Sequence, residues 1–517
     1  MRSTATITLS SHGFRVTDFN GEFAGHLSQF CRRFVQCKIE SKVINGKKIL
    51  ARVPDRTFAS ATKNRREIRL HLNCFEDFKN FMRNCGYNTD RFKIVQLEVP
   101  EGRNVKFEFT NPDIAPREHQ VEWLDYQLNL DPVKVNTKIN TLQTGKGKTF
   151  CAIYQMVKMG KRTVITLMPK YINTWLVGLA DFVKLNPEDI MVVQGSLELN
   201  AAMKLADSGK LTAKIIIVSL PTYQYFMAEY EDNDGAMTHY NYTPDQFWDV
   251  MEPGLLVVDE GHESIHALYR FDLYCNVRNK VVLSATLEAD DPFINDMYAV
   301  VYPKAIRFRG GEYDKYIDSV ALMYGLTSTK KIKFAGFGGT YSHVKLEQCI
   351  MKDRKILDNY LKFIGDTADY FYFKVAETNM RLLIYCATVD MCIKVVAYMR
   401  HRHNGSGLVI NKYTQEDPKS TLYDSDLTIS TLMSAGTGVD IPGLRTVIMT
   451  VAIGSKQKND QALGRLRRLK DFPDVTPTFV YFVCGNIRPH MEYHRKKLEN
   501  FANKTLSQRS FNSGFSL

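Results

Sequence analysis

The chain has 517 residues, of which 44% are hydrophobic and 24% are charged, and its formal net charge is +12. This composition excludes a disordered or fibrous chain, and the length is enough for roughly three to four domains. Residues 1–110 hold 20 Lys/Arg against 11 Asp/Glu, an imbalance that favours a polyanionic partner such as nucleic acid for that part of the chain.

Residues 1 to about 105 alternate strand-like and helix-like runs, which predicts a small α+β domain. Aromatic residues such as Phe34 and Phe58 lie among its basic clusters, which are Arg32-Arg33, Lys47-Lys48 and Lys63-Asn64-Arg65-Arg66. Cations interleaved with aromatic rings suit a surface that grips phosphates and stacks bases. Solvated charges around an aromatic core would give the same pattern, so both interpretations stay open at this point. Residues 100–116, with Gly102, Pro112 and Pro116, are predicted to form a linker, and a helix is predicted from Pro116 to about Leu128.

A Gly-rich turn at residues 142–149 opens a helix-like run that extends to Met159. Such a turn presents unpaired backbone N–H groups to an anion at the helix N-terminus. Lys148 would add a charge for the β- and γ-phosphates, and the Thr149 hydroxyl would coordinate Mg²⁺. The candidate nucleotide-binding residues of this P-loop are Thr144, Gly145, Lys146, Gly147, Lys148 and Thr149. Leu142 stands where the strict P-loop pattern has Gly.

Short apolar runs separated by helix-like segments occur on both sides of an irregular stretch at residues 303–340, which predicts two parallel-sheet domains joined by a hinge. The predicted strands are Thr163–Met168, Ile215–Ser219, Leu255–Val258, Val281–Ser284, Leu382–Tyr385, Leu408–Ile410, Leu427–Thr431, Val447–Val451 and Thr478–Phe482. Residues 228–246 are predicted to form an exposed loop. Arg488–Lys504 is predicted to be a basic helix and Ser507–Leu517 a loose tail.

Two adjacent carboxylates, Asp259 and Glu260, end the apolar run Leu255–Val258 and precede Gly261 and His262. At the carboxyl end of a strand, Asp259 can hold the Mg²⁺ that Thr149 also coordinates, and Glu260 can orient or deprotonate the attacking water. Their position after a P-loop in a parallel-sheet pattern predicts an ATPase site.

Asp259-Glu260-Gly261-His262 resembles the DExH box of superfamily 2 helicases. Further segments resemble the other motifs of that family in the same order along residues 115–485. They are Arg117 with Gln120, Thr166-Leu167-Met168-Pro169-Lys170 with Trp175, Ser219 with Thr222-Tyr223-Gln224, Ser284-Ala285-Thr286, Leu383-Ile384-Tyr385-Cys386, Ser430-Thr431 with Ala435 through Asp440, and Gln461 through Arg468. The family form of the P-loop, AxxGxGKT, also accommodates Leu142.

The resemblance implies two tandem RecA-like domains preceded by the small α+β domain, with the boundaries 1–105, 106–305 and 306–517. ATP and Mg²⁺ are the implied cofactors. The implied roles are adenine recognition for Arg117 and Gln120, ribose binding for Asp440, arginine fingers for Arg465 and Arg468, coupling for His262, Gln461, Ser284 and Thr286, and nucleic-acid contact for Pro169, Lys170, Thr222 and Thr431. Arg465 and Arg468, three residues apart, are expected on one helix face.

The small basic domain before the motor and the compact spacing of the last two motifs resemble UvsW-type recombination helicases of phages. This resemblance implies an ATP-dependent DNA helicase or translocase, 3′ to 5′ in polarity, that remodels forks and junctions in replication, recombination or repair. The predicted partner is single-stranded and branched DNA, with no membrane, and the predicted state is a monomer. Three alternatives stay open: a DExH RNA helicase, a duplex translocase that never separates strands, and a nucleotide-gated DNA-binding scaffold without turnover. Deleting residues 1–105 is expected to weaken binding to branched DNA more than basal ATPase activity.

The ten cysteines are scattered and include no CxxC pair, so they predict reduced thiols in a cytosolic protein, in the host cytoplasm if a virus encodes it. The N-terminus lacks the apolar core of a signal peptide, and no apolar run approaches the roughly 20 residues of a membrane span.

Overall fold

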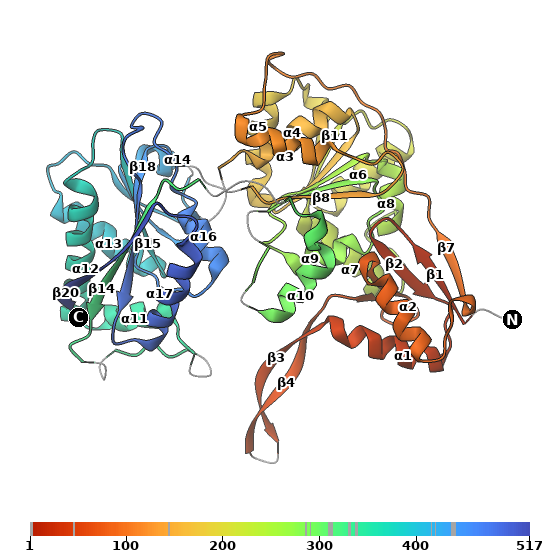
Figure 1. Cartoon of the computed structure of the whole chain (residues 1–517), viewed down its shortest axis with the longest axis horizontal. Coiled ribbons are helices and arrows are strands. Elements are labelled where there is room, and N and C mark those ends of the chain that lie inside the picture. Colours follow the sequence, from red (N-terminus) through yellow and green to blue (C-terminus); the bar gives the residue numbers. More distant parts are fainter. Residues whose placement is uncertain are drawn as a thin grey trace. The chain divides into compact units, whose positions relative to one another are not determined.

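The computed structural model describes residues 4–44, 47–142, 145–284, 287–289, 291–308, 314–328, 332–336, 340–414, 416–418, 420–435 and 441–517 (Figure 1). The chain forms two compact units. The first holds residues 1–142 and 146–310, and the second holds residues 143–145 and 311–517. The architecture is the expected one of two parallel-sheet, RecA-like α/β parts with a small α+β part at the N-terminus.

The N-terminal part of the first unit is a mixed sheet in the strand order β5-β6-β2-β1-β7, with two helices packed on it (Figure 1). Its elements are β1 (Ala5–Leu9), β2 (Gly13–Thr17), α1 (Gly21–Cys31), β5 (Ser60–Ala61), β6 (Ile68–His71), α2 (Phe75–Asn84) and β7 (Phe92–Gln96). A separate antiparallel hairpin, β3 (Val35–Ile44) with β4 (Lys47–Thr57), leaves this part of the chain and forms a two-stranded sheet of its own.

The first RecA-like sheet is wholly parallel, in the order β10-β11-β9-β12-β13-β8. Its strands are β8 (Asn136–Asn140), β9 (Thr163–Leu167), β10 (Ile190–Val193), β11 (Ile215–Ser219), β12 (Leu255–Val258) and β13 (Asn279–Leu283). Its helices are α3 (Glu118–Leu128), α4 (Lys148–Met159), α5 (Ile172–Phe182), α6 (Ser196–Asp207), α7 (Leu220–Asp232), α8 (Pro244–Met251), α9 (Ile265–Asp272) and α10 (Pro292–Val301). Helix α7 takes up the beginning of the segment predicted as a loop at residues 228–246, so that prediction was wrong for residues 228–232 and for the start of α8.

Alternation along the buried strands divides this sheet between two cores. Ile165 and Val257 point into a core formed with α3, α4 and α5, whereas their neighbours Val164 and Leu256 point to the opposite face. The core on that opposite face contains helices α6 to α10 and also the apolar residues of the N-terminal sheet, such as Phe14. The N-terminal part therefore shares a continuous core with the first RecA-like sheet.

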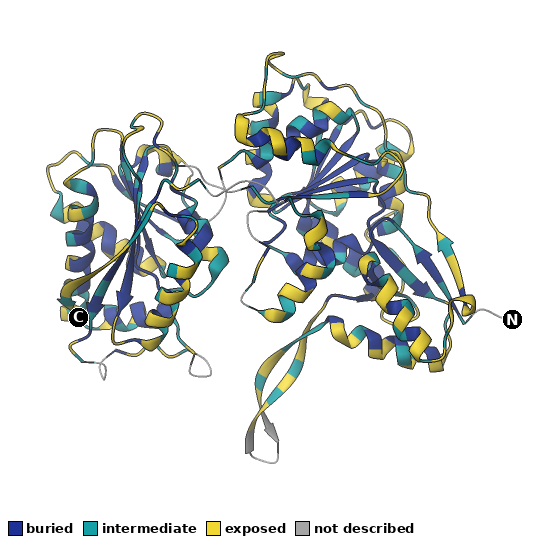
Figure 2. Ribbon diagram, in the orientation of Figure 1, coloured by how far each residue is buried: buried dark blue, intermediate teal, exposed yellow. Residues whose placement is uncertain are grey.

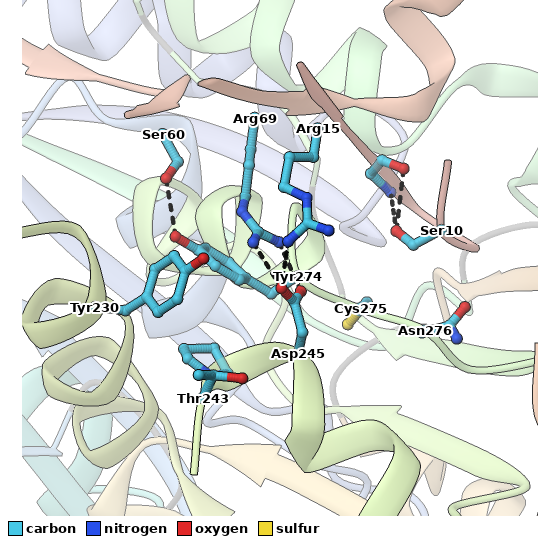
Figure 3. A network of polar contacts seen from close by, with 12 residues as sticks. Ser10, Arg15, Ser60, Arg69, Tyr230, Thr243, Asp245, Tyr274, Cys275 and Asn276 are labelled. Atoms are coloured by element: carbon cyan, nitrogen blue, oxygen red, sulfur yellow. Dashed lines mark hydrogen bonds and ion pairs between the residues drawn. The ribbon is translucent and has the colours of Figure 1, made fainter. Parts of the chain in front are cut away.

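Buried ion pairs reinforce this shared core (Figure 3). The guanidinium of Arg69, on β6, donates to both carboxylate oxygens of Asp245, on α8, at 2.6 Å each. It also donates to Glu67 at 2.7 Å and lies 4.1 Å from the ring centroid of Tyr274. Burial alone would raise the pKa of Asp245, but Arg69 holds it below its ordinary value. The contacts of Arg69 with Asp245 and Tyr274 join segments more than a hundred residues apart in the sequence.

A second buried group contains the ion pair of Asp272 with Lys280 and the imidazoles of His12 and His71. His12 lies 3.0 Å from the Thr137 hydroxyl through Nε2 and 2.7 Å from the Ser11 hydroxyl through Nδ1. Burial, with a smaller contribution from nearby Lys280, lowers the pKa of His12 to about 3.

Acidification is therefore expected to destabilise the first unit. Between pH 6.5 and 3 the unfolded chain binds a proton at His12 that the folded chain does not, so stability is lost as the pH falls. At about pH 5 this one group should cost on the order of 2 kcal/mol of unfolding free energy relative to pH 7. Urea denaturation of the wild type and of His12→Gln at both pH values measures it: the variant should lose less stability on acidification. Equal losses in the two proteins would contradict the expectation.

The second unit is a seven-stranded parallel sheet in the order β16-β17-β15-β18-β19-β14-β20. Its strands are β14 (Asp318–Gly325), β15 (Arg381–Cys386), β16 (Ile410–Tyr413), β17 (Leu427–Thr431), β18 (Leu444–Met449), β19 (Thr478–Cys484) and β20 (Ser507–Ser516). Its helices are α11 (His343–Lys352), α12 (Arg354–Ala368), α13 (Val389–Arg402), α14 (Ser420–Asp424), α15 (Leu432–Ala435), α16 (Lys456–Leu463) and α17 (Arg488–Phe501).

Two sequence predictions for this unit were wrong. The segment 303–340, predicted to be irregular, contains β14, which is an interior strand of the sheet. The predicted loose tail is β20, which pairs with β14 at the edge of the sheet and buries Leu517. All ten cysteines are free thiols, and among the described helices none combines the length and the apolarity needed to cross a bilayer.

Candidate nucleotide-binding site

The P-loop connects β8 to α4, and its last turn is fixed by a left-handed glycine. Gly147 caps the N-terminus of α4 with a φ of +82°, a conformation that favours glycine. A Cβ at this position would also lie 2.4 Å from the side-chain nitrogen of Gln120. Gln120 donates to the Lys146 carbonyl at 2.9 Å and accepts from the Arg117 backbone N–H at 2.9 Å. The amide of Gln120 thus ties the start of α3 to the P-loop.

Lys148 is buried at the first position of α4 and extends back along the loop. Its ammonium donates to the Leu142 carbonyl at 3.1 Å. Thr149 follows on the same helix and is partly buried. Thr144 lies outside the described residues. Leu142, which departs from the P-loop pattern, therefore contacts Lys148 through its backbone carbonyl. This contact does not require glycine at position 142.

Asp259 and Glu260 follow directly on β12, as the sequence predicts. The Asp259 carboxylate accepts from the Trp175 indole N–H at 2.8 Å and from the Glu260 backbone N–H at 2.9 Å. Burial, and after it the charge of Glu260, raises the pKa of Asp259 to about 7, while Trp175 and Lys148 act in the opposite direction. The buried Lys148 is therefore close enough to the half-buried Asp259 for their charges to interact. The Trp175 contact was missed at the sequence level, where this residue was only part of a motif.

Glu260 adopts a left-handed backbone with a φ of +48°, which is unusual for a residue with a side chain. The next residue, Gly261, approaches β13 so closely that a Cβ would lie 2.4 Å from Val282. His262 then lies 3.2 Å from a Glu260 carboxylate oxygen and 3.0 Å from the Ser284 hydroxyl through its Nδ1. The structure thus brings Glu260, His262 and Ser284 together at the ends of β12 and β13. Thr286, the other coupling candidate of that motif, lies outside the described residues.

The side chains of Lys148, Thr149, Asp259 and Glu260 fit Mg²⁺ and a nucleoside triphosphate. Burial and the charge of Glu260 destabilise the ionised form of Asp259 and so raise its pKa. A bound cation would stabilise that ionised form and offset both effects. One buried oxygen of Glu260 has no hydrogen-bond partner among the described residues, although His262 is close by. Such an oxygen fits a bound water. Asp259 and Thr149 would hold the metal, and the start of α4 with Lys148 would hold the phosphates.

The nucleic-acid candidates of the first unit lie at strand ends, but their side chains are engaged. Lys170 pairs with Glu263 at 2.9 Å, and the Tyr171 hydroxyl donates to the same carboxylate at 2.6 Å. Pro169 begins the short helical turn that carries both. The Thr222 hydroxyl is buried 2.8 Å from that of Ser219, in the cap of α7.

In the second unit, Thr431 similarly lies 2.8 Å from the Ser434 hydroxyl at the start of α15. The expectation that Arg465 and Arg468 share a helix face was wrong, because α16 ends at Leu463 and Gly464 is its C-cap. Arg465 is buried beyond that end and donates to the carbonyl of Gln461, on α16, at 3.3 Å. Arg468 is exposed and pairs with Asp314 at 2.6 Å. Asp440 lies outside the described residues.

No protein-family model matches the sequence, and no curated protein matches it. Among solved structures, the chain is similar to a fragment of a putative HsdR subunit of a type I restriction enzyme from Vibrio vulnificus YJ016, with 12% identity over 95% of this chain and 82% of that one, at a TM-score of 0.50. It is also similar to Mss116p bound to single-stranded RNA and AMP-PNP, with 14% identity over 80% and 82% of the two chains, at a TM-score of 0.48. The alignment with T4 UvsW has 14% identity over 99% and 100% of the two chains, at a TM-score of 0.31.

Of these three similarities, the first reaches a TM-score of 0.5 and supports the assignment of the fold. Together with the two parallel sheets, it shows two tandem RecA-like α/β domains. At this level of identity it shows the fold alone.

Proposed function

We propose that this protein is an ATP-dependent motor of superfamily 2, a helicase or translocase that acts on nucleic acid. The observation that carries the proposal is the convergence of Lys148, Asp259 and Glu260 at the carboxyl end of a parallel sheet, beside the N-terminus of α4. Ligands of parallel α/β sheets bind at this end of the strands. The roles of the individual residues are part of the proposal.

The chain's own groups divide the work of hydrolysis. Mg²⁺-ATP, when bound, supplies the phosphoryl group and the metal charge. Gly147 and Gln120 hold the P-loop in shape, and Lys148 neutralises phosphate charge. Asp259 would hold the metal, while Glu260 would orient the attacking water and accept its proton.

His262 and Ser284 then connect Glu260 to the end of β13. Burial lowers the pKa of His262, so its imidazole stays neutral. It can therefore link the positions of Glu260 and Ser284 without adding a buried charge. Through these contacts, a movement of Glu260 during hydrolysis would displace Ser284 at the end of β13, directly before residues 285–289.

We assign DNA as the track, and branched DNA in replication, recombination or repair as the substrate, with 3′ to 5′ polarity by family resemblance. Support comes from the basic N-terminal part. The loop of residues 62–67 is fastened by backbone bonds from Lys63 to the Glu231 carbonyl and from Asn64 to the Asp234 carboxylate. Its cationic side chains, those of Lys63, Arg65 and Arg66, are exposed. Fixed, solvent-facing cations suit phosphate contacts.

A nucleic-acid panel tests this function. ATP hydrolysis by the full chain is expected to rise several-fold with forked or single-stranded DNA, and most with forks. The same panel contains a four-way junction, a blunt duplex and RNA of matched length. Lys148→Ala is the control for contaminating ATPases and should show no stimulated hydrolysis. Stimulation by RNA alone would contradict DNA as the track, and hydrolysis that no nucleic acid alters would contradict the motor.

A further inference from the structure

The β3–β4 hairpin is a long two-stranded ribbon without a covering layer. Its strands of 10 and 11 residues pair along their whole length, with one bulge near Gln36. At about 3.3 Å per residue the ribbon extends roughly 30 Å. In Figures 1 and 2 it leaves the rest of its unit and its described surface is mostly exposed or half-buried. Isolated two-stranded ribbons are marginally stable in water, so one of this length requires a reason.

The base of the ribbon is firmly attached. Gln36 donates to the Asp291 carboxylate at 2.7 Å, at the start of α10, and the Thr57 carbonyl lies 2.8 Å from the His266 imidazole, on α9. Phe58 follows directly and is fully buried against Tyr269 and Phe293. Helix α9 begins five residues after Glu260 in the sequence, at Ile265. The ribbon is therefore mounted on the helix that the candidate catalytic loop leads into.

The two faces of the ribbon differ in chemistry. The register places Lys38, Glu40 and Ile49 on one face, where Lys38 pairs with Glu40 at 3.0 Å and with Asp55 at 3.1 Å. The other face carries Ile39 opposite Arg52 and Leu50 opposite Ser41. Ile39 is 69% exposed and Leu50 is 78% exposed. One face is therefore partly neutralised, and the other presents two apolar side chains beside an arginine.

The charge of the ribbon selects the class of partner. Residues 35–57 contain six Lys/Arg and two Asp/Glu, and both acidic residues contact Lys38. A strongly basic ribbon suits a polyanion better than an apolar protein groove. Two-stranded ribbons fit the grooves of duplexes, and exposed Ile or Leu side chains can wedge between base pairs and unstack them.

We propose that the β3–β4 hairpin contacts duplex DNA at the branch point and that its Ile39/Leu50/Arg52 face inserts there. Ile39 and Leu50 unstack the junction base pairs, and Arg52 holds a neighbouring phosphate. The attachment to α9 lets changes at the ATP site move the ribbon. This inference rests on the proposed motor function for its use, but its contact with DNA can be measured without ATP.

The experiment uses the full chain and a forked DNA with 2-aminopurine at the junction, without ATP. Binding of the wild type should raise the 2-aminopurine fluorescence, because the base is unstacked. Ile39→Thr with Leu50→Thr keeps β-branched or strand-compatible residues and should reduce this rise at least about fivefold at saturating protein. Ile49→Thr, the neighbour on the opposite face, is the matched control and should keep the rise within about twofold.

Arg52→Ala separates the charge from the apolar contact. It should weaken fork binding and lower the salt dependence by about one unit of slope, while leaving the fluorescence rise at saturation. No fluorescence rise in the wild type, or equal loss in Ile49→Thr and in the Ile39/Leu50 variant, would overturn the inference. Failure of the motor function has a different signature: ATP hydrolysis unaffected by any nucleic acid, whatever the fluorescence reports. If the inference holds and the motor functions, the Ile39/Leu50 variant should retain single-strand-stimulated hydrolysis and lose about tenfold in fork unwinding.

Discussion

Glu260→Gln is expected to lower the rate of ATP hydrolysis by about 100-fold or more while nucleotide and DNA binding persist. Glutamine keeps the size of the side chain and can still accept a hydrogen bond, but it cannot take up a proton from water. In the proposed role the lost function is proton acceptance by the Glu260 carboxylate, one oxygen of which is buried without a hydrogen-bond partner among the described residues. Steady-state hydrolysis and the binding of a fluorescent ATP analogue measure the two parts.

Glu252 provides a matched control for this substitution. Glu252 also has a left-handed backbone, with a φ of +47°. It lies before the start of β12, whereas Glu260 lies after the end of that strand. Glu252→Gln therefore imposes the same chemical change at the opposite end of the same strand, away from the P-loop, and hydrolysis should stay within about twofold. If Glu260→Gln kept more than about a tenth of the wild-type rate, the proton would be accepted elsewhere and the role given to Glu260 would be wrong.

The central strands of both sheets could be predicted because their signal is local. Ile215–Val218 and Leu255–Val258 are continuous apolar runs, and Leu427–Thr431 combines apolar residues with Thr and Ser. The observed strands β11 (Ile215–Ser219), β12 and β17 have the predicted bounds. A strand buried on both faces is apolar at most positions and carries no charge there, which is true of few other segments. The carboxylates at the end of β12 could be placed for the same reason, since the strand fixes where the turn begins.

The strand β20 could not be predicted because its support is tertiary. Its sequence, SQRSFNSGFS, is mostly polar. It is held by pairing with β14 and by the stacking of Phe515 on Phe363, with ring centroids 4.6 Å apart. Similarly, the spacing of Arg465 and Arg468 indicated one helix face, but α16 ends at Leu463 with Gly464 as its C-cap, and only the fold decides where a polar helix stops.

Arg69→Met is expected to lower the unfolding free energy of the first unit by about 3–5 kcal/mol. The Arg69 side chain is 4% exposed, whereas its partners Glu67 and Asp245 are 14% and 32% exposed, so water reaches the carboxylates only in part. Removing the cation leaves these two carboxylates partly buried without their main partner, which costs more than the ion pair itself contributes. Urea denaturation followed by tryptophan fluorescence measures the change, because Trp248 lies on α8 beside Asp245.

Arg33→Met is the control for loss of a surface charge. Arg33 pairs with Asp77 at 3.1 Å, but both side chains are about half exposed, so the loss should be below about 1 kcal/mol. A loss of similar size in both variants would show that the Arg69 pair behaves as a surface ion pair.

A second substitution distinguishes a stranded charge from lost packing. In Arg69→Met with Asp245→Leu the buried carboxylate is also removed, while Glu67 retains Arg15 at 3.8 Å. The double variant should recover most of the stability lost in Arg69→Met, because a buried ion pair can be replaced by apolar residues at little cost.

Deletion of residues 1–105 cannot be compensated by a second substitution, because it removes Arg69 and also uncovers the core shared with α6 to α10. The packing thus changes the expectation drawn from the sequence: the deletion should abolish ATP hydrolysis and DNA binding together. Substitution of Lys63, Arg65 and Arg66 leaves the fold intact and measures how much these side chains contribute to DNA affinity.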